Sequence, residues 1–365
     1  RLHEYQPPKE GRAEKVRLDF NENTVGCPPG VALALRRAMK PDWFTLYPEY
    51  EEARSRLARY FRVAPEELLI TNGVDDAIKL ICDTFVEAGD VLVTPTPTFA
   101  IYQFFHEVAG GAVRLVHYDQ DLQLSPERFL QSIDRRVRWV ALANPNNPTG
   151  ALMPKAHLKV ILEGARDTLI LVDEAYFDFS GVTILPWIRK YPNLIVSRTF
   201  SKAFGLAALR IGFMFAHKRL AGLMKRVHAA YAVNGVAVRA AVEAIRHQGY
   251  IRQYAGMIVK NRDDFCRRLE SWGIPHAPTE ANFVLVRVGA RAREIARRLR
   301  RRGVLVRDWS DNPRLGSYLR ITIGDASQMR RLSAELARLR FMVETVNGAA
   351  AWRDLTASLP IGWSA

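Results

Sequence analysis

The chain has 365 residues, of which 48% are hydrophobic and 25% charged, and these are the proportions of an ordinary globular protein. No run of about 18 apolar residues occurs, so we expect no membrane-spanning helix, and three scattered cysteines argue against a disulfide framework or a metal site and favour a reducing, cytoplasmic compartment. The net charge of +15 would permit nucleic-acid binding, but no helix-turn-helix, zinc-finger or aromatic-basic pattern accompanies it, so we expect no nucleic-acid partner.

The first forty residues hold an extended segment, LDFNENTVGCPPG, followed by a helix, VALALRRAMK. No strand partner lies near them in the sequence. We therefore expect them to join the C-terminal part of the chain or to lie across a cleft.

From about residue 66 to 215, short apolar stretches alternate with helical ones, which is typical of a mostly parallel sheet covered by helices. The expected strands are Leu68–Thr71, Asp90–Thr94, Ala112–His117, Trp139–Ala143, Leu169–Val172, Leu194–Thr199 and Ile211–Ala216. The expected helices are Asp75–Glu87, Phe99–Val108, Ser125–Ile133, Lys155–Ala165 and Lys218–His228.

After residue 250, a long arginine-studded helix leads into a compact α+β unit. Its expected elements are the strands Asn282–Val288, Gly303–Arg307 and Tyr318–Thr322, and a basic helix within Arg291–Gly303. That helix has one apolar stripe, so a solvated arginine face explains it without a partner. We predict an α/β fold with a large domain at residues 40–250 and a small domain formed by residues 1–39 and 251–345. The tail, residues 346–365, has no informative pattern.

The motif TNGVDDAI joins an expected strand to an expected helix. Backbone N–H groups at Gly73, Val74 and Asp75, together with the helix dipole, suit a phosphate group. An ordinary strand–turn–helix junction capped by an acidic residue would have the same pattern. This motif alone therefore leaves both interpretations open.

Two further motifs follow expected strands. ANPNNPTG, residues 143–150, would hold asparagine amides rigidly at the sheet edge, although a turn selected only for its shape is also compatible. In ILVDEAYFDF, Asp173 follows four apolar residues that indicate a buried strand, where a carboxylate is costly unless it meets a positive partner. Tyr176, three residues later, either reaches the same site or belongs to the core.

The stretch RTFSKAFGLAALRIGF contains a single lysine, Lys202, after an expected buried strand. A lysine shielded from water has a lowered pKa and can act as an amine nucleophile. Thr199, Ser201 and Arg210 offer hydroxyl groups and a fixed positive charge to a phosphate. A nucleophilic lysine, a phosphate site and a carboxylate for a ring nitrogen are what pyridoxal phosphate requires.

The motifs NPNNPTG, DEAY and TFSKAFGLAALRIG, in this order and spacing, resemble those of the fold type I pyridoxal-phosphate aminotransferases of classes I and II. The likeness extends over nearly the whole chain. Within that family, LDFNENTVG, LYPEY, TNGVDDAI, VLVRDWS and YLRITIG are most similar to the histidinol-phosphate aminotransferases. The resemblance implies a mostly parallel seven-stranded sheet between helices in the large domain, a smaller α+β domain, and pyridoxal 5′-phosphate as the cofactor.

The resemblance also implies a role for each matching residue. Lys202 would carry the cofactor covalently, and Asp173 would pair with its pyridine nitrogen. Tyr176 and Asn147 would hydrogen-bond its phenolic oxygen. The groups that would hold the cofactor phosphate are the backbone amides of Gly73, Val74 and Asp75 and the side chains of Thr199, Ser201 and Arg210.

Two positions depart from the family pattern. Phe99, in TPTFAIY, would stack on the cofactor ring, but the family commonly has tyrosine here, so a hydroxyl contact is lost. Val74 stands where a small residue such as serine is frequent, so the phosphate site there would rely on backbone alone. Tyr47, in LYPEY, would reach the cofactor phosphate of the neighbouring subunit, which implies a homodimer with shared active sites.

The substrate would be bound by Asn23, Arg307 and Arg320. Arg320 would bind a carboxylate or the group that replaces it, and Arg307 would lie near a substrate phosphate. Arg307 could instead pair with Asp308 or with another surface acid.

The resemblance implies ping-pong amino transfer between a small-molecule amino donor and a keto acid. The expected reaction converts histidinol phosphate and 2-oxoglutarate into imidazole-acetol phosphate and glutamate, in histidine biosynthesis. An aromatic or other amino-acid aminotransferase, and an amino-acid-phosphate decarboxylase on the same scaffold, stay open because motifs do not show which substrate bond breaks. A regulator that reuses the fold would need an added DNA-binding domain, and none is visible in the first forty residues.

Overall fold

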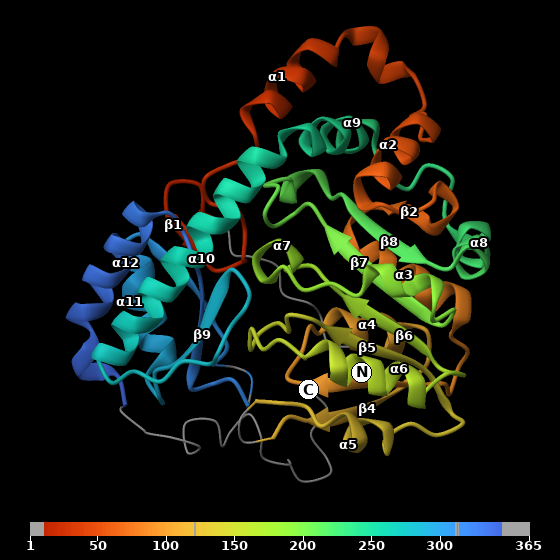
Figure 1. Cartoon of the computed structure of the whole chain (residues 1–365). Helices are drawn as coiled ribbons and strands as arrows, with labels where there is room; N and C mark the ends of the chain where they lie inside the picture. The colour runs from red at the N-terminus through yellow and green to blue at the C-terminus, as the bar shows by residue number, and fades with distance from the viewer. Residues whose placement is uncertain (1–10, 120–121, 311, 313, 345–365) are drawn as a thin grey trace.

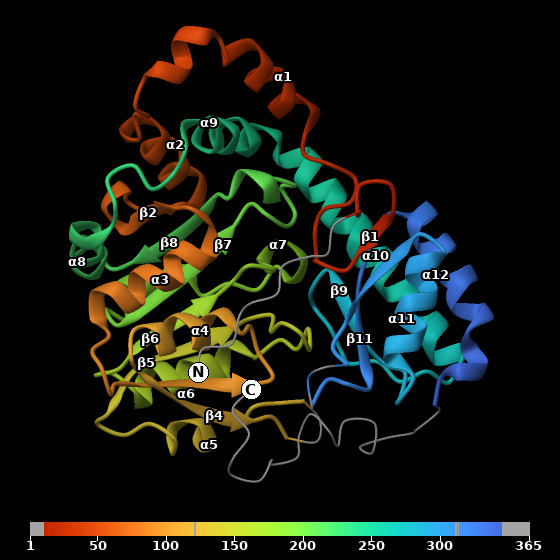
Figure 2. The same ribbon diagram turned by 180° about the vertical axis from the view of Figure 1, so that it is seen from behind.

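The computed structural model describes residues 11–119, 122–310, 312 and 314–344. A seven-stranded sheet and a four-stranded sheet lie side by side, and helices cover both (Figure 1). The long helix α10 (Gln248–Ser271) leads from the helices above the larger sheet down over the smaller one, and the view from behind shows the same arrangement (Figure 2). The tail at residues 346–365 lies outside the described residues.

The larger sheet has the order β2-β8-β7-β6-β5-β3-β4. Its strands are β2 (Leu68–Thr71), β3 (Val91–Thr96), β4 (Ala112–His117), β5 (Val137–Ala143), β6 (Leu169–Asp173), β7 (Leu194–Thr199) and β8 (Gly212–Ala216). All neighbours run parallel except β8, which is antiparallel to both β2 and β7. The predicted mostly parallel sheet of seven strands is therefore confirmed.

The central strands read as continuous apolar runs because both faces of the sheet are covered. Along β5, Val140 and Leu142 face one core cluster, whereas Trp139 and Ala141 face the other. The helices that contribute to the two clusters include α2 (Glu51–Phe61), α5 (Pro126–Leu130) and α6 (Lys155–Gly164) for the first, and α3 (Gly73–Phe85), α4 (Ile101–Val108) and α8 (Lys218–Val227) for the second.

The five helices expected between residues 75 and 228 all form, with ends that differ from the expectation by at most three residues, most clearly in α5 and α3. Helix α5 ends at Leu130 rather than Ile133, because the Ser132 carbonyl accepts a hydrogen bond from Arg114 and the chain turns there. Helix α3 begins at Gly73 rather than Asp75, and its first turn is fixed by a 2.9 Å hydrogen bond from the Asn72 N–H to a carboxylate oxygen of Asp76.

The smaller sheet has the order β1-β10-β11-β9, and three helices pack on it. Its elements are β1 (Val16–Leu18), β9 (Phe283–Arg287), β10 (Val304–Asp308), β11 (Tyr318–Thr322), α10, α11 (Ala292–Arg301) and α12 (Ala326–Arg338). The N-terminal extended segment does find a strand partner there, because β1 pairs in parallel with β10. In the domain division that we propose, this sheet belongs to the small domain.

Helix α1 (Pro29–Ala38) neither joins the smaller sheet nor lies across the site. It packs against α9 (Gly235–Ala244), above the larger sheet, and buries Val31 (Figure 1). Close approach depends on Gly30, since any side chain at this position would collide with the His247 ring.

The remaining short elements are α7 (Phe177–Ser180) and the 3-10 turns η1 (Pro41–Thr45), η2 (Pro65–Glu67), η3 (Leu185–Arg189), η4 (Ala207–Leu209), η5 (Ile245–His247) and η6 (Arg340–Met342). Within the described part of the chain, no helix combines the length and the apolar character that are needed to span a bilayer.

Candidate active site

Three neighbouring strands, β5, β6 and β7, run parallel and therefore end at the same edge of the larger sheet. Asn147 lies in the turn after β5, Asp173 is the last residue of β6, and Lys202 follows the end of β7. Open α/β sheets bind their ligands at this edge. The topology thus places three of the motifs from the sequence side by side.

Lys202 is half-buried, and its amine lies against the N-terminal segment. Its Nζ donates a hydrogen bond to the Phe20 carbonyl at 3.2 Å and lies 5.8 Å from the centre of the Tyr176 ring. Burial is the largest cause that lowers the pKa of Lys202, and together with the positive charge of Arg320 and against the opposing effect of Glu22 it brings this pKa from 10.5 to about 8. An amine with this pKa is available as a nucleophile at mildly alkaline pH.

Asp173 is 4% exposed, and different donors hold its two carboxylate oxygens. The Tyr102 hydroxyl donates to Oδ2 at 2.8 Å, while Oδ1 accepts from the Ser197 hydroxyl at 2.9 Å and from the Ala175 N–H at 3.1 Å. Burial raises the pKa of Asp173 from 3.8 to about 6, although these hydrogen bonds lower it. The carboxyl group is therefore fixed in orientation, and a positively charged ligand would favour its ionised form.

Tyr176 and Asn147 contact residues from the other side of the site. The Asn21 amide donates to the Tyr176 hydroxyl at 2.9 Å. Arg320, on β11, donates to Asn147 Oδ1 at 2.6 Å and to the Asp19 carbonyl at 2.9 Å. Asn21 has a left-handed backbone conformation (φ 55), which asparagine adopts more readily than most residues. Residues 19–21 therefore connect the smaller sheet to the strand ends of the larger one.

The start of α3 forms a corner that suits an anion. In the described structure, the Asn72 side chain makes no capping hydrogen bond, so the first N–H groups of the helix remain open to a ligand. Arg210 lies beside them, and its Nη2 donates to Asp75 Oδ2 at 3.0 Å. A Cβ atom on Gly73, which has φ +81, would come within 2.8 Å of the same nitrogen. The glycine thus lets the guanidinium approach the helix start.

The hydroxyls of Thr199 and Ser201 belong to the same corner. They lie 2.9 Å apart, and the Ser201 N–H donates to the Thr199 oxygen at 3.0 Å. Sheet register places Thr199 opposite Gly212, which in turn lies opposite Thr71 at the end of β2. A Cβ atom on Gly212 would lie 2.6 Å from the Gly73 carbonyl carbon, so the strand and the helix start are packed as closely as backbones allow.

Arg307 and Arg320 are cross-strand partners on the antiparallel strands β10 and β11. The Arg307 guanidinium lies 5.1 Å from the centre of the Phe20 ring and 4.8 Å from that of Trp309, and Arg320 lies 5.8 Å from the same Trp309 ring. Among the described residues, Arg307 forms no ion pair with Asp308, whose carboxylate accepts a 2.9 Å hydrogen bond from the backbone N–H two residues on. The guanidinium groups of Arg307 and Arg320 therefore both lie close to the Trp309 ring.

Asn23 uses its side-chain amide within the protein. Its Oδ1 accepts hydrogen bonds from the N–H groups of Val25 and Gly26, both at 2.9 Å, and its Nδ2 donates to the Ala203 carbonyl at 3.1 Å. The amide thus fastens the N-terminal segment to the loop that carries Lys202. Its role in substrate binding stays a prediction.

Phe99 and Tyr47 lie in different surroundings. Phe99 precedes α4, and its ring packs edge-on against the Tyr102 ring, with the ring centres 5.6 Å apart. The Tyr102 hydroxyl in turn donates a hydrogen bond to the Asp173 carboxylate. Tyr47 is 75% exposed and stacks on Tyr231, with the ring centres 4.5 Å apart. Its contact with a partner subunit stays a prediction.

Sequence reasoning missed Tyr102, Ser197, Asn21 and Trp309. Tyr102 follows Phe99 at helical spacing in TPTFAIY, and that spacing could have placed both rings on one side. Asn21 is the first asparagine of the NEN motif. Ser197 and Trp309 carry no local signal, because only strand pairing and register bring them to the site.

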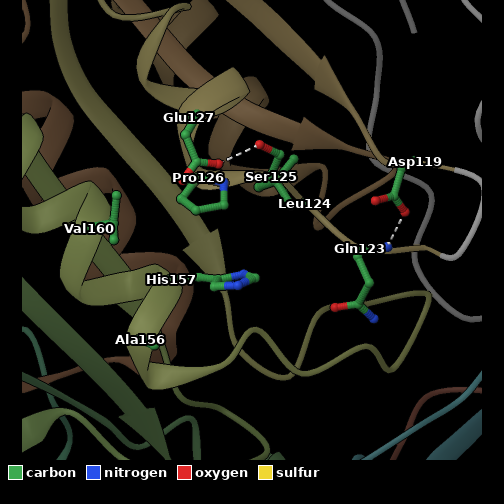
Figure 3. A pocket seen from close by; sticks show the side chains of 9 residues that line it. All are labelled: Asp119, Gln123, Leu124, Ser125, Pro126, Glu127, Ala156, His157 and Val160. Carbon is green, nitrogen blue, oxygen red and sulfur yellow. Dashed lines mark hydrogen bonds between the residues drawn. The ribbon is translucent and has the colours of Figure 1, made fainter.

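A separate pocket of about 310 Å³ lies away from these residues, between the start of α5 and α6. Figure 3 shows the His157 ring pointing into it, opposite Pro126 and Glu127. None of the predicted site residues lines this pocket. In the described part of the chain, no group of three or more His, Cys, Asp or Glu side chains is placed to hold a metal ion.

The side chains at the strand ends, here called the strand-end cluster, are chemically suited to pyridoxal phosphate. The cluster consists of Asn147, Asp173, Tyr176, Thr199, Ser201, Lys202 and Arg210, with the start of α3 at Gly73. A lysine with a lowered pKa suits the aldehyde. A buried carboxyl group suits the ring nitrogen, and an uncapped helix start beside Arg210 and two hydroxyls suits the phosphate. The close approach of Arg210 to Gly73 leaves no room for a side chain in that corner.

The comparisons with known proteins agree with this chemistry. Residues 13–336 match the family model for aminotransferases of class I and II. A histidinol-phosphate aminotransferase from Caldanaerobacter subterraneus subsp. tengcongensis is 35% identical over 316 residues, covering 86% of this chain and 89% of the relative.

Solved structures show the same fold. A histidinol-phosphate aminotransferase from Sinorhizobium meliloti, in complex with pyridoxal-5′-phosphate, aligns with a TM-score of 0.83 at 29% identity and covers 91% of this chain and 92% of its own. An L-threonine-O-3-phosphate decarboxylase from Porphyromonas gingivalis aligns with a TM-score of 0.77 at 26% identity, covering 88% and 98%. The fold is thus shared by enzymes that break different bonds. With the family model matched over most of its length, this chain belongs to the class I and II aminotransferases, the fold type I enzymes that depend on pyridoxal phosphate.

Proposed function

We propose that this aminotransferase moves the amino group of histidinol phosphate to 2-oxoglutarate by a ping-pong mechanism, giving imidazole-acetol phosphate and glutamate in histidine biosynthesis. The observation that carries the proposal is the pair of guanidinium groups at Arg307 and Arg320 on the smaller sheet, whereas Arg210 lies beside the start of α3 on the larger sheet. Histidinol phosphate carries a dianionic phosphate on the carbon next to the one that bears its reacting amine, at the end opposite its imidazole ring. Such a substrate needs fixed positive charge away from the cofactor's own phosphate.

The two arginines would bind different parts of the substrate, according to their positions in the site. Arg320 contacts Asn147 and lowers the pKa of Lys202, so its guanidinium acts close to the reacting groups. Arg307, which contacts Phe20 and Trp309, would bind the substrate phosphate. In the second half-reaction the same pair would bind the two carboxylates of 2-oxoglutarate.

The residues of the strand-end cluster would hold the cofactor. The Gly73, Val74 and Asp75 amides, with Thr199, Ser201 and Arg210, would bind its phosphate. Asp173 would pair with the ring nitrogen, while Tyr176 and Asn147 would bind the phenolic oxygen and Phe99 would stack on the ring.

Bound pyridoxal phosphate supplies an electron sink for the bonds at the substrate's α-carbon. Lys202, whose amine has a pKa of about 8, would accept the α-proton and return it. Asp173, whose ionised form a positive partner favours, would pair with the ring nitrogen and keep it protonated. Phe20 and Tyr176 lie against the Lys202 amine and limit the access of water.

We also propose a homodimer in which Tyr47 reaches the partner's site. Support comes from a set of exposed apolar side chains, since large patches of this kind mark interfaces. They are Leu33, Met39, Phe44, Leu46, Tyr47 and Tyr231. Mixing inactive Lys202→Ala subunits with Tyr47→Ala subunits would create hybrid dimers with one native site, so activity above the sum of the two variants is expected. Unchanged activity after subunit exchange, or a monomeric mass in light scattering, would exclude shared sites.

The cellular compartment is proposed from the cysteines. Cys27, Cys82 and Cys266 are free thiols, which suits a reducing environment, and we propose the cytoplasm. Nucleic acid and membrane have no part in the proposed function.

Two other reactions on this fold compete. An aromatic aminotransferase would prefer phenylalanine or tyrosine as the donor, and an amino-acid-phosphate decarboxylase would release carbon dioxide. The deciding experiment incubates the purified enzyme with histidinol phosphate and 2-oxoglutarate and measures glutamate. Because histidinol phosphate has no carboxyl group to lose, a second incubation replaces it with L-threonine O-3-phosphate, the substrate of the decarboxylase neighbour, and measures carbon dioxide. One glutamate per substrate consumed, with no carbon dioxide, is expected. Release of carbon dioxide, or no turnover of histidinol phosphate, would refute the proposal.

A further inference from the structure

Tyr102 lies in the first turn of α4 and is fully buried. Its hydroxyl donates to Asp173 Oδ2 at 2.8 Å. Burial and the neighbouring carboxylate raise the pKa of Tyr102 well above 10, so the hydroxyl keeps its proton, and remains a donor, over the working pH range.

The two oxygens of Asp173 are held unequally. Oδ1 accepts from both the Ser197 hydroxyl and the Ala175 N–H, so the loss of one donor leaves the other. At Oδ2, the Tyr102 hydroxyl is the hydrogen-bond donor that the described residues provide. Removing it would leave a buried carboxylate oxygen unsatisfied and the carboxyl group free to rotate about its Cβ–Cγ bond.

The Tyr102 ring makes a second relevant contact. It meets the Phe99 ring edge-on, with centres 5.6 Å apart and planes at 86°. Phe99 precedes α4 and Tyr102 lies one helical turn later, so the fully buried Tyr102 ring supports the half-buried Phe99 ring. A single side chain therefore contacts the group proposed for the ring nitrogen and the group proposed for the ring face.

We propose that Tyr102 is a positioning residue of the cofactor site. Its hydroxyl orients the Asp173 carboxylate, and its ring fixes the orientation of the Phe99 ring. The inference rests on the cofactor roles proposed for Asp173 and Phe99. Tyr102 itself acts through these two residues. Its hydroxyl occupies one lone pair of Oδ2 and would thereby hold the carboxylate in the orientation in which it pairs with the pyridine nitrogen.

The hydroxyl and the ring can be separated by substitution. Tyr102→Phe removes only the oxygen and keeps the contact with Phe99, whereas Tyr102→Leu removes both. Tyr118→Phe is the matched control, because Tyr118 is a buried tyrosine whose hydroxyl makes no hydrogen bond to Asp173 among the described contacts. Unfolding temperatures of the three cofactor-free proteins show whether each variant retains the fold.

The test measures the dissociation constant of pyridoxal phosphate for each cofactor-free protein and the absorbance spectrum of the bound cofactor. A hydrogen bond to a charged group corresponds to roughly a tenfold or greater change in affinity. We expect Tyr102→Phe to weaken binding by about tenfold and to shift the spectrum, Tyr102→Leu to weaken it further, and Tyr118→Phe to match the wild type.

Asp173→Ala, alone and combined with Tyr102→Phe, separates the inference from the proposal beneath it. If Tyr102 acts through Asp173, Tyr102→Phe should have little further effect on affinity or spectrum in the Asp173→Ala background. Wild-type affinity and spectrum in Asp173→Ala would refute the role of Asp173 itself. A clear effect of Asp173→Ala without any effect of Tyr102→Phe, or full additivity of the two, would overturn the role of Tyr102 alone.

Discussion

Arg307 and Arg320 stand opposite each other on antiparallel strands, and their guanidinium groups lie 4.8 and 5.8 Å from the same Trp309 ring. Two positive charges held this close repel each other, and the face of an aromatic ring offsets only part of the repulsion. The Trp309 indole nitrogen is buried and has no hydrogen-bond partner within the described residues. We infer that an anionic substrate group completes this arrangement.

The first prediction concerns the attachment of the cofactor. Lys202→Ala removes the one amine in the cluster, so the purified protein should lose the visible absorbance of covalently held cofactor together with turnover. Lys225→Ala, an exposed lysine on α8, is the control and should remain yellow and active. Wild-type activity in Lys202→Ala would disprove the assignment of the lysine.

The second prediction concerns the pH dependence of cofactor capture. Capture needs the neutral amine, and burial lowers the pKa of Lys202 to about 8. The rate at which the cofactor-free protein binds pyridoxal phosphate covalently should therefore rise with pH and level off just above pH 8. Stopped-flow absorbance between pH 6 and pH 11 provides the measurement. A rate that continues to rise beyond pH 10 would mean that the lysine is not shielded.

The third prediction is that replacing Asp173 has opposite effects on stability and on activity. Burial raises its pKa from 3.8 to about 6, so the folded chain binds a proton more tightly than the unfolded chain does. The stabilising effect of this proton is fully present below pH 3.8 and is lost as the pH rises through 6. Asp173→Asn should therefore raise the free energy of unfolding of the cofactor-free protein at pH 8, by up to about 3 kcal/mol.

The same substitution should lower turnover by several orders of magnitude, since an amide does not hold the ring proton. Thermal unfolding at pH 4 and pH 8 measures the stability effect, and the gain should be much smaller at the lower pH. A turnover loss of less than about tenfold would show that the carboxylate is only structural. A variant that is destabilised at pH 8 would contradict the origin of the pKa shift.

The fourth prediction concerns the phosphate corner. Gly73→Ala places a Cβ atom 2.8 Å from Arg210 Nη2 and forces a side chain into a backbone conformation with φ +81. Displacement of the guanidinium should weaken pyridoxal phosphate binding by about tenfold or more, with little change for pyridoxal, which lacks the phosphate. Gly222→Ala on α8, where a Cβ meets nothing within 4 Å, is the control. Equal losses for both compounds would place the phosphate elsewhere.

Some of the site was predictable because strong local signals fix it. The apolar runs that end in Asp173 and in Thr199 marked strands that lie together in the sheet, so their C-terminal residues had to meet. The contact between Asn21 and Tyr176 and the pairing of Arg307 with Arg320 depend on how the N-terminal segment adds to the smaller sheet. Sequence periodicity carries no information on such long-range register. The location of helix α1 was predicted wrongly for the same reason, because its narrow apolar face does not indicate which helix it packs against.

The most direct measurement compares kcat/KM for histidinol phosphate, phenylalanine and tyrosine in the wild type and in Arg307→Ala. Arg301→Ala is the control, because it removes the same charge from an exposed position on α11. Histidinol phosphate should be the preferred donor, and its preference over both amino acids should collapse in Arg307→Ala and persist in Arg301→Ala. Preference for an aromatic amino acid in the wild type, or an unchanged ratio in Arg307→Ala, would contradict the proposed substrate and leave an aminotransferase with a different donor.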